Sequence, residues 1–210
     1  MLKFRMQGYI INVNPVKDED LIVTILTKES ILVTYRFYGA RHPTIQLGYK
    51  IDFEAQTSIK STIPQLRSVM HLGAKWLTQR ERVFVWQSFI GLFYKHLKDI
   101  DDIDDFYFDL LEQSAQKWEK QNPKRVVIES YLKLLEHEGR IHDEFICFNC
   151  EQKIEEDPTL IRGFLMAHQE CVYSHSFERL HVKHMFEKKS TIYFDDEMVE
   201  KLWRIVLEGF

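Results

Sequence analysis

The sequence predicts an α+β protein in which a small five-stranded β-barrel precedes an α-helical domain with a zinc-knuckle insert. Three observations lead to this prediction. Over the first seventy-odd positions, short runs of β-branched and aromatic residues alternate with turn formers. From Thr78 onward, apolar residues recur at helical spacing. All three cysteines fall, with one histidine, into one metal-binding pattern. We therefore expect two domains, residues 1–77 and 78–210.

Five segments of the first domain have the length and composition of strands. Closing so small a sheet into a barrel is the simplest way to remove its edges, and a five-stranded sandwich is the alternative. In the third segment we expect the alternating set that starts at Ile31 to face the core and the set that starts at Leu32 to face outward. The expected strands are Gly8 to Val13, Leu21 to Thr27, Ile31 to Tyr38, Ile51 to Thr57 and Leu66 to His71.

Helix-capping residues punctuate the second domain. Thr78 has the spacing of an N-cap, with Glu81 three residues later as its capping-box partner. Asn122-Pro123 is expected to open another helix that ends near Gly139. The segment Ser176 to Glu187 is expected to be helical, and Asp195 is expected to cap the closing helix.

Two ligand pairs predict one structural zinc site. Within each pair, two residues separate the ligands, and seventeen residues separate the first pair from the second. Four protein ligands complete the tetrahedron of a structural zinc and leave no position for water or substrate. The alternative is three unrelated thiols beside a surface histidine, and His175, His181 and His184 are further candidates for the fourth ligand. The predicted ligands are Cys147, Cys150, His168 and Cys171.

The net charge of −4 divides unevenly along the chain. Residues 1–82 hold 12 Lys and Arg against 7 Asp and Glu, whereas the remainder holds 16 against 25. The basic excess makes the first domain the place to expect a polyanionic ligand. No apolar stretch is long enough to cross a bilayer, the N-terminus lacks the pattern of a secretory signal, and three cysteines suit a reducing compartment. We expect a cytoplasmic protein.

Three short motifs resemble those of the RecO family of bacterial recombination mediators. The first is Gly8-Tyr9-Ile10-Ile11 with the hairpin strand Asp20 to Thr27, and the second is Tyr38-Gly39-Ala40-Arg41. The third is Gly163-Phe164-Leu165, which leads into His168 and Cys171. The turn departs from the family pattern because His42-Pro43-Thr44 stand where relatives usually carry more Lys and Arg.

The resemblance implies that the first domain is an OB-fold that binds single- and double-stranded DNA. It also implies a non-enzymatic role in the repair of DNA damage by recombination. The protein would anneal complementary strands and would help to load recombinase onto single strands coated by single-strand-binding protein, together with RecR.

Single strands bind OB-folds through a positive groove and aromatic platforms. Arg41 is the foremost candidate because it lies in the Gly39 to Gly48 connection and matches the family's turn. The residues expected to contact nucleic acid are Arg36, Tyr38, Arg41, Lys60 and Arg67.

Two other functions fit the same residues. A zinc-containing protein–protein adaptor would use the barrel to bind protein rather than DNA, which the overall acidity favours. A metallohydrolase would require an open metal position near a base such as Glu170, but four protein ligands close the site. The eight glycines never cluster into a phosphate-binding loop, which argues against ATP-driven work by this chain.

Overall fold

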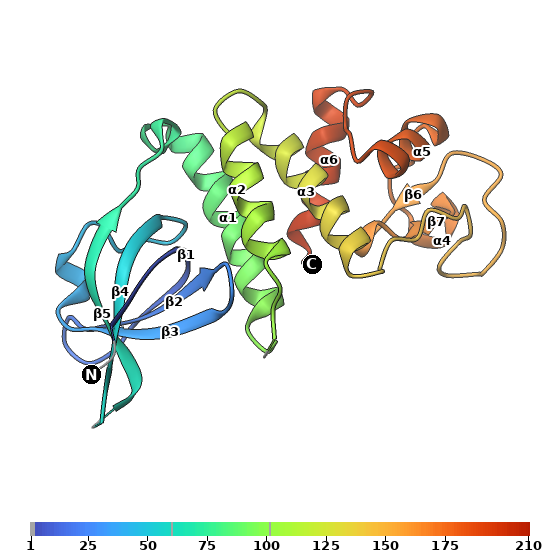
Figure 1. Cartoon of the computed structure of the whole chain (residues 1–210). Coiled ribbons are helices and arrows are strands. Elements are labelled where there is room, and N and C mark those ends of the chain that lie inside the picture. Colours follow the sequence, from blue (N-terminus) through green and yellow to red (C-terminus); the bar gives the residue numbers. More distant parts are fainter. Residues whose placement is uncertain (1–2, 60, 101) are drawn as a thin grey trace. The chain divides into compact units, whose positions relative to one another are not determined.

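The computed structural model describes residues 3–59, 61–100 and 102–210 (Figure 1). The chain divides into two compact units, with the division between Glu119 and Lys120. The strands of the first unit end at His71, and its two helices extend the unit well past residue 77. The functional division expected between residues 77 and 78 stays a prediction.

The first unit contains the predicted closed barrel, with strand order β1-β2-β3-β5-β4. Ladders join neighbouring strands except at one place, where β3 and β5 run parallel and share the single pair Tyr35↔Gln65. The barrel core is apolar, and Ile10, Ile25 and Phe53 are fully buried in it. The strands are β1 (Lys3–Pro15), β2 (Leu21–Thr27), β3 (Ile31–Arg36), β4 (Lys50–Ser58) and β5 (Ser61–His71).

The predicted inward face of β3 is wrong. Thr34 is fully buried, whereas Val33 and Phe37 are 45% and 47% exposed. The Thr34 hydroxyl donates to the Val23 carbonyl at 3.0 Å, so this polar side chain is satisfied inside the barrel. Leu32 packs against the barrel core on the same face as Thr34. Arg36 therefore belongs to the inward-facing set of β3 rather than to the outward one.

Two helices complete the first unit: α1 (Arg80–Leu97) and α2 (Phe106–Lys117). The expected capping box at Thr78 is wrong, because α1 follows Gln79 and has no side-chain cap. The Thr78 hydroxyl instead donates to the Lys75 carbonyl at 3.1 Å, closing a 3₁₀ turn, η2 (Lys75–Thr78). The Trp86 indole of α1 donates to the Gly48 carbonyl at 2.8 Å, which ties the helix to the loop before β4.

The second unit is helical with a small two-stranded sheet. Its caps follow the sequence: Asn122 accepts from the Lys124 amide at 3.0 Å, and Asp195 accepts from the Met198 amide at 2.8 Å. Gly139 has the left-handed φ of 64° that ends a helix. The elements are α3 (Pro123–His137), β6 (Thr159–Leu160), η3 (Arg162–Phe164), β7 (Met166–Ala167), α4 (Gln169–Val172), α5 (Arg179–Lys188) and α6 (Asp196–Leu207).

Candidate nucleic-acid groove and metal centre

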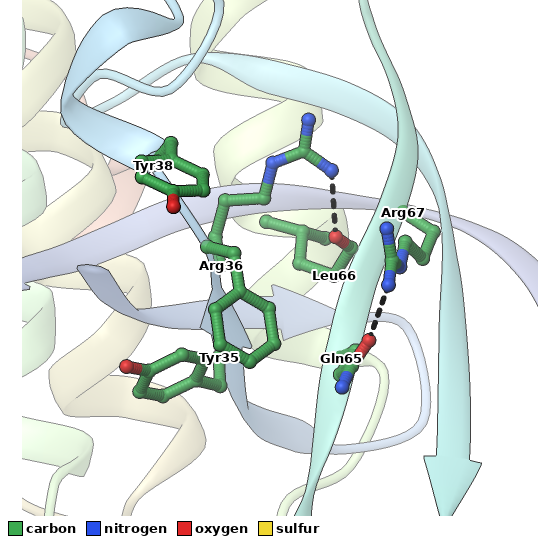
Figure 2. Close-up of a pocket in the computed structure, with 7 residues that line it drawn as sticks. Tyr35, Arg36, Tyr38, Gln65, Leu66 and Arg67 are labelled. Atoms are coloured by element: carbon green, nitrogen blue, oxygen red, sulfur yellow. Dashed lines mark hydrogen bonds between the residues drawn. The ribbon is translucent and has the colours of Figure 1, made fainter. Parts of the chain in front are cut away.

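Arg36 bridges the point at which β3 and β5 diverge. Its Nη1 donates to the Leu66 carbonyl at 2.9 Å (Figure 2). Its Nη2 lies 3.1 Å from Nε2 of His42. Its Nε is buried and has no hydrogen-bond partner in the described part of the chain. Burial, together with the nearby charge of Arg67, lowers the pKa of Arg36 below its ordinary value.

A groove of about 300 Å³ opens beside this bridge. Figure 2 shows its two sides: Tyr35, Arg36 and Tyr38 on one, and residues of β5 on the other. The lining includes two guanidinium groups and three aromatic rings but no carboxylate. Such a combination suits an anion that is attached to a flat ring. The lining residues are Tyr35, Arg36, Phe37, Tyr38, Gln65, Leu66 and Arg67.

Asp20 fixes the turn that carries Tyr38. One oxygen of Asp20 accepts from the Tyr38 amide at 2.7 Å, and the other accepts from the Tyr35 hydroxyl. These two hydrogen bonds lower the pKa of Asp20. Tyr38 has a left-handed φ of 51°, which is strained for a tyrosine, and the Asp20 contact holds it there. Sequence reasoning missed Asp20 because the residue was taken only as the start of a strand.

Arg41 lies in a short 3₁₀ turn, η1 (Gly39–Arg41), at the edge of the groove. Its guanidinium lies 5.2 Å from the centroid of the Tyr38 ring and forms an ion pair with Glu19. The Ala40 amide also donates to the Glu19 carbonyl at 2.9 Å, so the two turns are joined through the backbone as well.

The structure thus brings together most of the residues selected from the sequence. Arg36, Tyr38 and Arg67 line one groove, and Arg41 contacts it through the ring of Tyr38. Arg67 donates to Gln65 at 2.6 Å on the β5 side. Lys60 lies outside the described residues. Binding of nucleic acid by these five residues stays a prediction.

In the second unit, Cys147, Cys150, His168 and Cys171 converge, with their ligand atoms all within 4.8 Å of one another. Nδ1 of His168 lies 3.3 Å from the Cys150 sulfur and 4.0 Å from the Cys171 sulfur. A tight turn carries the first pair, closed by the Glu151 amide on the Cys147 carbonyl at 2.8 Å. The second pair begins α4, where the Cys171 amide bonds to the His168 carbonyl at 3.1 Å.

The chemistry of these four residues fits a metal ion. Nε2 of His168 lies 3.2 Å from the Lys153 carbonyl, so that nitrogen donates its proton and leaves the Nδ1 lone pair for a metal. Burial opposes ionisation of Cys147, but backbone amides from Cys150, His168 and Asn149 lower its pKa to about 6.

The third thiol behaves differently. Burial, with the neighbouring Cys147 and Cys150, raises the pKa of Cys171 to about 11. Three thiolates so close together require a cation among them. The four residues can therefore bind a metal. Of the four histidines considered as the fourth ligand, His168 is the one that lies with the three cysteines.

Comparison with known families decides the nature of the barrel. Residues 6–77 match a family model described as RecO N terminal. The barrel matches the RecO N-terminal domain. The match supports a RecO-type protein of recombination repair, as the sequence motifs implied. No curated protein matches the chain. In the described part of the chain, no helix combines the length and the apolar character needed to cross a membrane.

Proposed function

We propose that this protein is a non-enzymatic DNA-binding mediator of recombinational repair. It binds single- and double-stranded DNA and anneals complementary strands. With RecR, it helps to load recombinase onto strands coated by single-strand-binding protein. The observation that carries the proposal is the groove between β3 and β5, in which two arginines and an exposed tyrosine meet without a carboxylate, on a RecO N-terminal barrel.

The groove supports this function through two physical contributions. The guanidinium groups of Arg36 and Arg67 attract phosphate, which makes binding dependent on salt. Tyr38 is 58% exposed and offers a ring face to a base, worth about 1 to 3 kcal/mol by stacking. Arg41 and Lys60 are proposed as further contacts to phosphate.

We also propose that the metal is a structural zinc. Sulfur and imidazole ligands suit zinc, and four protein ligands leave no position for a reacting water. The zinc would hold the Cys147–Cys150 turn against the start of α4, with no role in a chemical step. Metal analysis of the purified protein should find one zinc per chain and none in Cys147→Ser.

Fluorescence anisotropy of a labelled single-stranded oligonucleotide, titrated at several salt concentrations, tests DNA binding. We expect affinity to fall as salt rises, and Arg67→Ala to reduce the slope of log K against log salt by about 0.7. Tyr38→Ala should weaken binding without changing that slope. Lys75→Ala is the control, because this exposed cation lies outside the groove lining.

Absence of binding at low salt would contradict direct DNA contact and would favour the protein-adaptor function. Annealing of two labelled strands, followed by energy transfer, tests the next step. Co-elution with purified RecR and with single-strand-binding protein tests the partners.

A further inference from the structure

Glu19 is paired with Arg41, a cation at the edge of the proposed nucleic-acid site. Its carboxylate forms an ion pair with Nε of Arg41. That same guanidinium lies over the ring of Tyr38. Tyr38 in turn lines the groove (Figure 2). A phosphate that approaches Tyr38 and Arg36 therefore meets an arginine that is already paired with an acid of the same chain.

The pair can be displaced. The side chains of Arg41 and Glu19 are 66% and 42% exposed, and exposed ion pairs of this kind contribute little to stability. A phosphate makes stronger charge-assisted hydrogen bonds with a guanidinium than with neutral donors. Replacing the carboxylate by a phosphate thus requires only that the Glu19 side chain swing into solvent.

The turns do not depend on this side-chain contact. The Glu19 carbonyl accepts from the Ala40 amide, and Asp20 holds the Tyr38 amide. Neutralising the Glu19 carboxylate therefore leaves both backbone contacts in place, so the effect on binding can be measured without unfolding the turn.

We propose that Glu19 is an affinity-determining residue of the groove: an internal competitor that holds Arg41 until a nucleic-acid phosphate displaces its carboxylate. The inference rests on the proposed function and concerns how strongly that site binds. It makes the intrinsic affinity for single strands lower than the number of arginines indicates, and it predicts that removing an acid improves binding.

The test is a double-mutant cycle measured by anisotropy with the same labelled oligonucleotide. Glu19→Gln should bind about two- to five-fold more tightly than the unaltered protein, the range expected for release of an exposed ion pair. Its salt slope should steepen by up to about 0.7, since the contact of Arg41 with phosphate no longer releases a carboxylate that takes up a cation. In an Arg41→Ala background, Glu19→Gln should have no effect.

Glu29→Gln is the matched control. It removes the same charge from the turn at the other end of β2, between β2 and β3. The inference is wrong if Glu29→Gln increases the affinity for the oligonucleotide as much as Glu19→Gln does, or if Glu19→Gln still increases it in the Arg41→Ala background. Either result would assign the effect to long-range charge alone. If the unaltered protein binds and Glu19→Gln binds equally, the inference is likewise wrong while the proposed function stands. If neither binds at low salt, the proposed function itself is wrong.

Discussion

Arg36 illustrates how one residue can serve both the fold and a binding site. It sits on the inward-facing set of β3, donates to the Leu66 carbonyl across the parallel pair and still lines the groove. The neighbouring Arg67 repels it, and its Nε has no partner among the described atoms. The residue is thus held in place by a structural bond while its charge remains at the groove where we propose that nucleic acid binds.

Arg36→Met keeps the apolar stem but removes the donor to Leu66. We expect the free energy of unfolding to fall by about 1 to 2 kcal/mol, because a buried carbonyl loses its hydrogen bond. Urea denaturation measures this free energy. Arg67→Met is the control, and because Arg67 is exposed it should change stability by less than about 0.5 kcal/mol. Equal stability of the two variants would mean that the single backbone pair suffices to join the strands.

Tyr9 gives the first unit a dependence on alkaline pH. Burial, and then the hydrogen bond to Glu112 at 2.6 Å, raise the pKa of Tyr9 well above its ordinary value of about 10. The folded state therefore holds this proton more tightly than the unfolded state does. Its contribution to stability is complete below about pH 10 and is lost as the pH rises further.

The urea midpoint measured between about pH 8 and pH 11 checks this dependence. Tyr9→Phe should lower stability near neutrality, because Glu112 loses a donor, and should flatten the alkaline decline. Tyr173→Phe, at a position 91% exposed, should retain the full decline. A decline of the same steepness in Tyr9→Phe would assign it to other groups.

At the scale of elements, the sequence specified the strands better than their faces. Each strand of the barrel overlaps a segment chosen from β-branched and aromatic residues, and the capped starts of α3 and α6 agree. The prediction of which β3 residues face the core was wrong because both faces of the strand carry apolar residues. In addition, the buried Thr34 hydroxyl finds its hydrogen-bond acceptor on a neighbouring strand. The alternation of residues alone therefore could not show which of the two faces is buried.

Local spacing explains which site residues could be predicted. The metal group follows from two pairs of ligands three positions apart, so it is visible in the sequence. The pairing of Arg41 with Glu19 joins two turns, and it depends on where the barrel places them. Asp20 was missed for the same reason, since its partners Tyr35 and Tyr38 lie on another strand and turn.

The contact between Gly48 and Trp86 ties α1 to the loop before β4. A Cβ on Gly48 would lie 2.6 Å from the Trp86 ring, and φ at this glycine is +84°. We expect Gly48→Ala to lower the free energy of unfolding by more than about 2 kcal/mol, from backbone strain and steric overlap together.

Gly73→Ala separates the two causes. Gly73 has a positive φ of +59°, but a Cβ there would meet no atom within 4 Å. It should therefore show the strain alone, about 1 kcal/mol. If both substitutions cost the same in urea denaturation, the Trp86 ring moves aside freely and does not tie α1 to the loop.

At the scale of the whole molecule, two compact units carry two separate candidate sites. The groove belongs to the first unit and the metal group to the second. Because the four ligands come from segments separated by seventeen residues, loss of the metal should loosen the second unit without direct effect on the barrel.

Hydrogen exchange followed by mass spectrometry can test this separation. On chelation, we expect faster exchange at amides between residues 147 and 171, and unchanged exchange in the strands of the barrel. Added zinc should restore protection, whereas Cys147→Ser should remain unprotected with zinc present. Unchanged exchange around the cysteines after verified metal removal would contradict a structural metal.

The strand order of the barrel also determines when the barrel can close as the chain is synthesised. β5 lies between β3 and β4, so the wall has a gap until the final strand arrives. At synthesis rates of about 5–20 residues per second, the apolar strands that emerge first wait some seconds for residues 61–71 to leave the ribosome. During that interval β3 has an unpaired edge, which is open to other extended chains. The fold is thus most exposed to misassembly before its last strand is made, and substitutions in β5 should reduce the yield of folded protein more than their effect on the finished barrel would indicate.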